Sequence, residues 1–216
     1  MNLKIFLFIV AAVVLLSSCE KSIQEDAYEV YQLQMVRQGS HYHDDHTVLD
    51  ITSFTSSIFS VSVKLDTSLF VTNEGSFQSK LVGFYEDQIH QNSARVSYQT
   101  ITNDVQGELI DSLSFKTYVY NNGLRSLDEN YTLLTLSRIQ VEKLLKNDEA
   151  IEINIELTPT QYLFQVNDGE ITAVTRTCNL APDACKYLTY HYYGGPDSIP
   201  APHDMKLWVK YNDVMK

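Results

Sequence analysis

The chain has 216 residues, of which 44% are hydrophobic and 11% aromatic, and it carries a formal net charge of −11 at pH 7. An excess of acidic side chains opposes binding to the phosphates of nucleic acids and to anionic lipid headgroups, so we expect neither as a partner. The length is sufficient for one large hydrophobic core or two small ones, and we expect one because no long linker divides the chain. The fourteen tyrosines and nine phenylalanines favour β-strands.

The amino-terminal residues have the pattern of a targeting segment. Lys4 precedes a run from Ile5 to Leu16 that has no charged or polar side chain, and Ser17, Ser18 and Cys19 follow it. As a helix, the apolar run would span about 18 Å, which is short of the roughly 30 Å hydrocarbon core of a bilayer. The segment is therefore typical of a signal peptide and not of a transmembrane helix.

Leu16-Ser17-Ser18-Cys19 resembles the lipobox of bacterial lipoprotein precursors. The resemblance implies cleavage before Cys19, a diacylglyceryl group on its thiol and an acylated new amino terminus, and several acyl chains give stable membrane anchoring. It divides the chain into a signal peptide (1–18), a lipidated cysteine with a polar tether (19–26) and a folded domain (27–216). Because Glu20 and not an aspartate follows the cysteine, it also implies the outer membrane, with the domain on either the periplasmic or the outer face.

The folded domain contains many short segments in which apolar and polar residues alternate, the pattern of half-buried β-strands. In chain order the predicted strands lie near residues 29–35, 47–51, 59–65, 77–84, 95–102, 113–120, 151–157, 162–166, 171 onward, 187–193 and 205–211. One short helix is predicted after Ser137, because Gln140 stands three residues later as in a capping box. The fold class is therefore all-β, an antiparallel β-sandwich with one short helix.

Two of the three cysteines lie close together in the sequence. Cys178 and Cys185 enclose the segment from Asn179 to Ala184. Outside the cytoplasm, such a pair is typical of a disulfide, and a Cys-x6-Cys spacing without a second pair suits zinc poorly. We therefore predict a disulfide between Cys178 and Cys185.

The densest group of metal-capable side chains is His41-Tyr42-His43-Asp44-Asp45-His46. On a strand, His41 and His43 would point to the same face, and a turn at the two aspartates would return His46 toward them. Three protein ligands and a water form a catalytic zinc site, but the spacing matches no zinc-protease motif. Two interpretations remain: a polar surface loop, or a divalent metal held by His41, His43 and His46.

Aromatic residues gather near the carboxyl terminus. Tyr187, Tyr190, Tyr192 and Tyr193 precede a turn at Gly194-Gly195, and Trp208 lies between Leu207 and Val209. If Leu207 and Val209 face the core, Trp208 faces outward. Because aromatic rings stack on the C–H faces of sugars, Tyr192, Tyr193 and Trp208 are candidate glycan-binding residues. The alternative is that they belong to the core and to a sheet edge.

The chain has no Gly-x-Ser-x-Gly or Ser-x-x-Lys motif, and this favours a binding module over an enzyme. The first hypothesis is an outer-membrane lipoprotein that binds a glycan or a protein partner without a cofactor. The second is a metal-binding protein or metal-dependent hydrolase that uses the histidine group. The third is a structural subunit of an envelope assembly whose sheet edges contact a partner strand.

Overall fold

The computed structural model describes residues 31–42, 53–71, 78–105, 108–194 and 200–212. Its strands are β1 (Gln32–Val36), β2 (Ser53–Phe54), β3 (Ile58–Leu65), β4 (Ser79–Tyr85), β5 (Ser93–Val105), β6 (Glu108–Asn121), β7 (Leu124–Arg125), β8 (Thr132–Ser137), β9 (Ile151–Leu157), β10 (Gln161–Val166), β11 (Thr172–Thr175), β12 (Lys186–Thr189) and β13 (Met205–Asn212). A 3-10 turn, η2 (Thr67–Leu69), and the helix α2 (Arg138–Lys146) complete the described elements.

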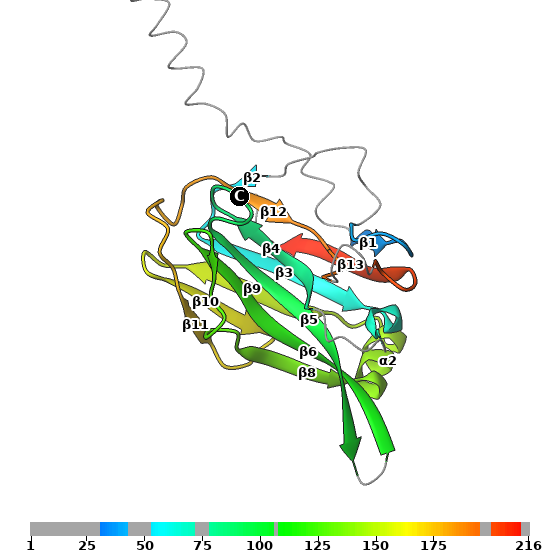
Figure 1. Cartoon of the computed structure of the whole chain (residues 1–216). Coiled ribbons are helices and arrows are strands. Elements are labelled where there is room, and N and C mark those ends of the chain that lie inside the picture. Colours follow the sequence, from blue (N-terminus) through cyan, green and yellow to red (C-terminus); the bar gives the residue numbers. More distant parts are fainter. Residues whose placement is uncertain (1–30, 43–52, 72–77, 106–107, 195–199, 213–216) are drawn as a thin grey trace, which may run out of the picture.

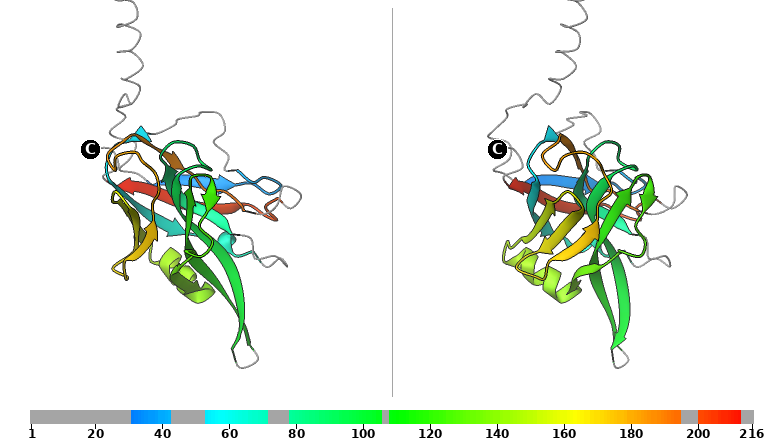
Figure 2. Two further views of the ribbon diagram at one scale, coloured as in Figure 1. Left: turned by 60° about the vertical axis from the view of Figure 1, so that its left-hand side comes forward. Right: turned by 90° about the vertical axis from the view of Figure 1, so that its left-hand side faces the viewer.

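These strands form two antiparallel sheets that lie one on the other (Figure 1). One sheet has the order β1-β13-β3-β9-β10-β11 and is called the β9 sheet below. The other has the order β2-β12-β4-β5-β6-β7, with β8 also paired to β6, and is called the β5 sheet. The predicted all-β sandwich is thus confirmed. Figure 2 shows that the hairpin of β5 and β6 extends beyond the body of the sandwich.

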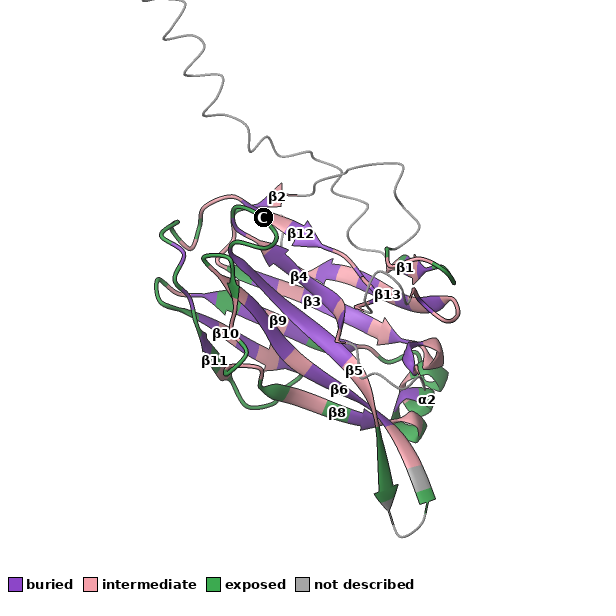
Figure 3. Ribbon diagram, viewed as in Figure 1, coloured by how far each residue is buried: buried purple, intermediate pink, exposed green. Residues whose placement is uncertain are grey.

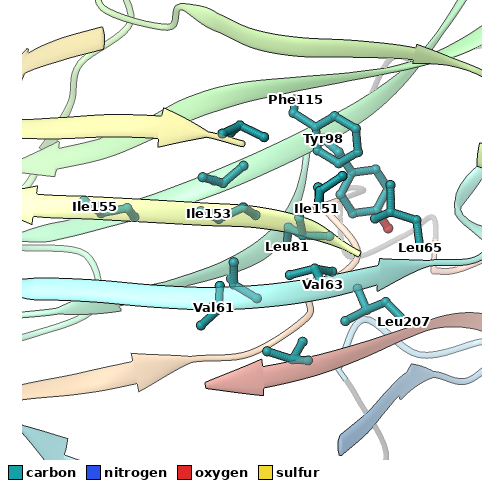
Figure 4. Packing of buried hydrophobic residues seen from close by; sticks show 14 of the residues in the cluster. Val61, Val63, Leu65, Leu81, Tyr98, Phe115, Ile151, Ile153, Ile155 and Leu207 are labelled. Carbon is teal, nitrogen blue, oxygen red and sulfur yellow. The ribbon is translucent and has the colours of Figure 1, made fainter. Parts of the chain in front are cut away.

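The hydrophobic core lies between the two sheets, and the strands that alternate most regularly in the sequence supply it. Figure 4 shows β3 and β9 packed against β4, β5 and β6. The contributing side chains include Val61, Val63, Leu65, Leu81, Tyr98, Phe115, Ile151, Ile153, Ile155 and Leu207. All are almost completely buried, and each removes apolar surface from water, which is the main stabilising contribution to such a fold.

The helix α2 follows the predicted capping pattern. Ser137 accepts a hydrogen bond from the backbone N–H of Gln140, and the Gln140 side chain accepts one from the backbone N–H of Ser137. This capping box satisfies two amide groups that have no partner inside the helix. Val141 is the fully buried residue of the helix and joins the core.

The first strand does not follow the usual pattern in which apolar side chains face the core and polar ones face solvent. On β1, Gln34 is 4% exposed and Val36 is buried, whereas Leu33 is 45% exposed. The Gln34 amide is satisfied at both ends, because Nε2 donates to the Tyr211 hydroxyl at 3.1 Å and Oε1 accepts from the His191 backbone at 2.9 Å. A buried amide with both partners is compatible with a core.

In the described residues, no helix is long and apolar enough to cross a membrane. The predicted signal peptide, Cys19, the tether, and the predicted strand at 47–51 lie outside the described residues. Lipidation at Cys19 and an outer-membrane location therefore stay predictions.

Candidate functional site: the outer face of the β5 sheet

The side of the β5 sheet that is turned away from the core carries tyrosines and basic residues. On β4, β5 and β6 the core takes Phe84, Ala94, Val96 and Val119, so the residues that alternate with them face outward. The strand register places these outward residues in three rows: Tyr187, Tyr85, Ser93, Tyr120 and Arg125; then Thr189, Gly83, Arg95 and Tyr118; then Lys80, Ser97 and Lys116.

Eight of these and adjoining side chains are called the tyrosine–cation face below. They are Lys80, Tyr85, Arg95, Tyr118, Tyr120, Arg125, Tyr187 and Tyr192. They come from the five neighbouring strands β12, β4, β5, β6 and β7 and from the segment after β12, where Tyr192 pairs with Lys80 through two backbone hydrogen bonds of 2.9 and 3.0 Å.

Lys80 faces outward because β4 contains an irregularity at this point. The register between β4 and β5 shifts between Lys80 and Val82, so Leu81 is an extra residue opposite β5. Leu81 and Val82 are both fully buried in the core, while Lys80 is left on the other side. A bulge of this kind redirects a side chain without ending the strand, and it explains why the alternation near 77–84 is irregular in the sequence.

Gly83 makes room for Arg95. A Cβ atom at Gly83 would lie 2.3 Å from the Ala94 carbonyl oxygen and 2.8 Å from Cγ of Arg95. The Arg95 side chain therefore passes directly over the glycine and is 4% exposed. Figure 3 shows the corresponding part of β5 as buried, which fits a strand that is covered on both faces.

Three cations surround the ring of Tyr118. Lys80 Nζ, Arg95 Cζ and Arg125 Cζ lie 4.8, 4.8 and 4.3 Å from its centre. Lys80 Nζ also lies 5.0 Å from the centre of the Tyr192 ring, and Arg95 Cζ lies 5.6 Å from that of Tyr120. Each cation–π contact contributes about 0.5–1 kcal/mol where water is near, but the three positive charges also repel one another.

Burial and the neighbouring positive charges shift the pKa values of the basic side chains in this cluster. Burial, followed by the nearby charges of Arg95 and Arg125, lowers the pKa of Lys80 to about 8. Burial also lowers the pKa of Arg95 from its usual high value. His90, whose ring meets that of Tyr120 edge-on at 5.4 Å, has a pKa lowered first by burial and then by Arg95 and Lys80. At neutral pH, below the lowered pKa of Lys80, the lysine is mostly charged, while the lowered pKa of His90 favours its neutral form.

The aromatic rings at the edge of the face are partly open to solvent. Tyr85 and Tyr187 stack with their ring centres 5.2 Å apart at an angle of 24°, and both are intermediate in exposure. Tyr120 and Tyr192 are likewise intermediate, while Tyr118 lies deeper. The face therefore presents several tyrosine rings at different depths around a charged centre.

Gln78 holds Arg125 in place at one side of the face. Its Nε2 donates to Ser97 Oγ at 2.7 Å and to Asn130 Oδ1 at 2.9 Å, and its Oε1 accepts from Arg125 Nη2. The guanidinium is thereby positioned over Tyr118 by a neutral amide and not by a carboxylate.

The three predicted glycan-binding residues lie in different parts of the molecule. Tyr192 belongs to the tyrosine–cation face. Tyr193 is 1% exposed and is part of the core. Trp208 lies on β13 of the β9 sheet, where Leu207 and Val209 face the core, so its predicted outward direction is confirmed but it faces away from the other sheet. These three residues therefore do not share a surface: Tyr192 and Trp208 face outward from different sheets, and Tyr193 is buried.

His41 is held by the neighbouring tyrosines. Its ring lies 5.8 Å from the ring centres of both Tyr192 and Tyr193, and Nδ1 lies 3.0 Å from the Tyr193 carbonyl oxygen. His43 and His46 lie outside the described residues. Within the ranges that the structure describes, no group of three or more His, Cys, Asp or Glu side chains is arranged to hold a metal ion.

The predicted disulfide between Cys178 and Cys185 is not formed, because Cys178 is a buried free cysteine, and burial raises the pKa of its thiol. The loop between the two cysteines is instead fixed by cations. Arg176 Nη2 donates to the Leu180 carbonyl at 2.6 Å, and Lys186 Nζ donates to the carbonyls of Pro182 and Ala184, each at 2.6 Å. These bonds fix the loop through its carbonyl groups.

The sequence contained only a weak signal for the tyrosine–cation face. Ser93, Arg95 and Ser97 alternate with apolar residues on β5, and Tyr118 and Tyr120 alternate with Val119 on β6. Polar residues that alternate in this way are ordinary for a solvent-facing side of a sheet. Only the register across the strands shows that the cations and tyrosines meet.

No family model and no curated protein matches the chain. Among solved structures it is similar to alginate lyase Aly36B, with a TM-score of 0.44 and 10% identity over 86% of this chain and 82% of that one. It is similar to SCLam, a non-specific endo-β-1,3(4)-glucanase of family GH16, with a TM-score of 0.47 and 9% identity over 84% and 69%. It is also similar to congerin II with lactose and MES, with a TM-score of 0.35 and 12% identity over 84% and 100%. Likeness at this distance carries no argument about function, so the function is argued from the site alone.

Proposed function

We propose that the protein is a non-catalytic, lipid-anchored binding module whose β-sandwich binds a glycan on the tyrosine–cation face. The observation that supports the proposal is the set of partly exposed tyrosine rings on the outer side of the β5 sheet, at Tyr85, Tyr120, Tyr187 and Tyr192. Tyrosine offers an apolar face for the C–H groups of a sugar and a hydroxyl for its polar groups. The lipid at Cys19, implied by Leu16-Ser17-Ser18-Cys19, would keep this module at the outer membrane.

Binding of immobilised oligosaccharides by the full-length protein tests the proposal. The protein is kept in a polyoxyethylene detergent, which contains no sugar headgroup. Tyr120→Ala removes one ring of the face, and Trp208→Ala removes a comparable ring from the outer side of the β9 sheet. We expect Tyr120→Ala to weaken binding at least tenfold and Trp208→Ala to leave it within twofold. The reverse result would move the glycan site to the β9 sheet, and no binding by the wild-type protein would contradict the proposed function.

The membrane anchor is tested separately by cell fractionation of Cys19→Ser. We expect the wild-type protein in the membrane fraction and the variant in the soluble fraction, because the acyl chains supply the membrane affinity. A variant that stays in the membrane fraction would contradict the lipoprotein proposal but would leave glycan binding untouched.

One observation favours the alternative of a metal-binding function. A carbonyl oxygen only accepts hydrogen bonds, so the contact with the Tyr193 carbonyl makes Nδ1 of His41 the protonated nitrogen. Nε2 then carries the lone pair, and it is buried without a hydrogen-bond partner. In this tautomer, Nε2 is the nitrogen that could bind a metal. Stoichiometric zinc in the purified wild-type protein, lost in His41→Ala and in His43→Ala, would support this alternative, and absence of metal from the wild type would reject it.

A further inference from the structure

The tyrosine–cation face has a strong positive charge in a protein that is otherwise acidic. The whole chain carries 27 acidic and 16 basic residues. Three of the basic residues, Lys80, Arg95 and Arg125, surround a single tyrosine ring. Within the described part of the chain, none of the three forms an ion pair with a carboxylate, because the ion pairs there involve other residues.

Arg95 is the member of the cluster that most needs a counter-ion. Its side chain is only 4% exposed, and its Nε and Nη2 atoms have no hydrogen-bond partner. A buried guanidinium normally has both a charge partner and satisfied donors. In Arg95, which faces the outer side of the sheet, two nitrogen donors have no such partner.

Two hydroxyl groups near Arg95 also lack hydrogen-bond partners. Ser93 Oγ and Thr189 Oγ1 are buried and have no hydrogen-bond partner. Ser93 is the outward residue before Arg95 on β5, and Thr189 lies in the same row as Arg95, with Gly83 between them. Because Gly83 has no side chain, no β4 side chain separates the hydroxyl of Thr189 from the guanidinium of Arg95.

From these unpartnered donors we infer that the glycan bound at the tyrosine–cation face is an anionic one, with a carboxylate or sulfate group that pairs with Arg95 and Lys80. This inference rests on the proposed function and names its ligand class. An arginine guanidinium matches the two oxygens of a carboxylate or sulfate through parallel N–H donors. The nearby tyrosine rings then contact the apolar side of the same sugar or its neighbour.

Among the residues that the structure describes, the groups that face Lys80 from the surrounding elements are neutral or positive. They are Arg95 on β5, Tyr118 on β6, Arg125 on β7, Tyr192 after β12 and, further away, His90 between β4 and β5. Burial, followed by the charges of Arg95 and Arg125, lowers the pKa of Lys80 to about 8. A bound anion would counter both effects, since it would supply the opposite charge that the face lacks.

Affinity measurements with three oligosaccharides of similar length test the inference on the full-length protein in polyoxyethylene detergent. One probe is a carboxylated oligogalacturonate, one is a sulfated oligosaccharide and one is a neutral β-glucan. We expect at least one charged probe to bind ten times more tightly than the neutral probe, and we expect this advantage to fall several-fold between 50 and 500 mM NaCl, because salt screens charge pairs.

Two variants and a matched control locate the effect. Arg95→Met and Lys80→Met should each reduce the affinity for the charged probe at least tenfold while changing that for the neutral probe less than threefold. Lys210→Met on β13 removes the same charge from the outer side of the β9 sheet and should change neither. If Arg95→Met does not fold, Lys80→Met alone decides, because Lys80 is less deeply buried than Arg95.

The outcomes separate the two proposals. Preference for the carboxylated or for the sulfated probe identifies which anion is recognised, and either supports the inference. Equal or tighter binding of the neutral probe would overturn the anionic class but leave glycan binding in place. If Lys210→Met weakened binding as much as Lys80→Met, general charge and not this face would be responsible. If no probe bound, the proposed function itself would fail.

Discussion

The ion pair between Glu86 and Arg176 is expected to be among the most costly contacts to break, since both side chains are 1% exposed. Arg176 Nη2 donates to Glu86 Oε1 at 2.5 Å and Nε donates to Oε2 at 3.1 Å, and the Tyr162 hydroxyl also donates to Glu86. Arg176 and Lys186 fix the loop before β12. The residue after Lys186, Tyr187, pairs with Tyr85, so this pair supports one side of the tyrosine–cation face.

We predict that Glu86→Gln lowers the free energy of unfolding by about 3 kcal/mol and that Arg176→Met lowers it by about 5 kcal/mol. Removal of one partner of a buried ion pair costs about 3–5 kcal/mol, because the other charge is left uncompensated. Glu86→Gln falls at the low end, since Arg176 keeps its bonds to the carbonyls of Thr158, Pro159 and Leu180. Arg176→Met falls at the high end, since it removes the donor from all three carbonyls as well.

The effect of Glu86→Gln should also depend on pH, through Lys186. In the folded protein, burial lowers the pKa of Lys186 to about 8, while Glu86 opposes that shift. Below pH 8 the lysine is charged in both the folded and the unfolded chain, so the cost of burying the charge is present in full. Between pH 8 and 10.5 the unfolded chain binds more protons, and stability therefore rises with pH. Without Glu86 the folded pKa of Lys186 falls further, so the deficit of the variant should be larger at pH 6.5 than at pH 9.

Urea unfolding of the full-length protein, followed by the fluorescence of the single tryptophan, Trp208, measures these differences by linear extrapolation. Asp148→Asn is the matched control. Asp148 is 82% exposed and pairs with Lys64 at 2.7 Å, and exposed pairs contribute about 0–1 kcal/mol. If Glu86→Gln lowered the free energy of unfolding no more than Asp148→Asn does, the buried pair would not stabilise the loop, contrary to the prediction.

Three further predictions concern the site and the loop. Gly83→Ala should lower the free energy of unfolding by about 2–3 kcal/mol, because its Cβ would collide with Ala94 and Arg95. Gly39→Ala is the control, since Gly39 shares a positive φ with Gly83 but has no atom within 4 Å, and it should cost about 1–2 kcal/mol; equal losses in a thermal melt would argue against the collision. Affinity for an anionic oligosaccharide should decline as the pH rises above 8, where free Lys80 loses its proton, and Lys80→Met should remove this decline; a pH-independent wild type would contradict the role of Lys80. Cys178 should resist alkylation in the native protein and react in urea without reductant, as peptide mass mapping would show; protection in urea until a reductant is added would instead indicate the disulfide.

The strands that alternate most strictly were predictable from the sequence. On β9, Ile151, Ile153, Ile155 and Leu157 are all buried, with polar residues between them. The same alternation predicted β3. The helix was predictable because its capping box is a local signal that requires only Ser137 and Gln140.

The site was not predictable, because it depends on pairings between strands that are far apart in the sequence. Arg95 and Tyr118 are opposite each other only through the register of β5 and β6, and Tyr187 reaches Tyr85 only because β12 pairs with β4. The direction of Lys80 depends on a bulge. Such pairings are set by the whole hydrophobic pattern and not by any local motif.

Closeness in sequence was misleading where a segment passes from one environment to another. Tyr192 and Tyr193 are adjacent, but one joins the outer face and the other the core. Cys178 and Cys185 are near each other in sequence, but Arg176 and Lys186 fix the intervening loop through its carbonyl groups. In both cases the physical environment of each side chain, and not its spacing, decides its role.

The proposed anionic ligand would account for the arrangement around Tyr118, which a requirement to fold does not by itself explain. Three cations near one ring repel one another, and Arg95 leaves two buried donors unsatisfied. A sheet that needed only to fold would place neutral residues there, since buried charges without partners are destabilising. Yet a bulge at Lys80 and a glycine at position 83 both serve to accommodate these cations. A local arrangement that opposes stability while other residues accommodate it is typical of a functional site, and its positive charge is what the proposed anionic glycan would pair with.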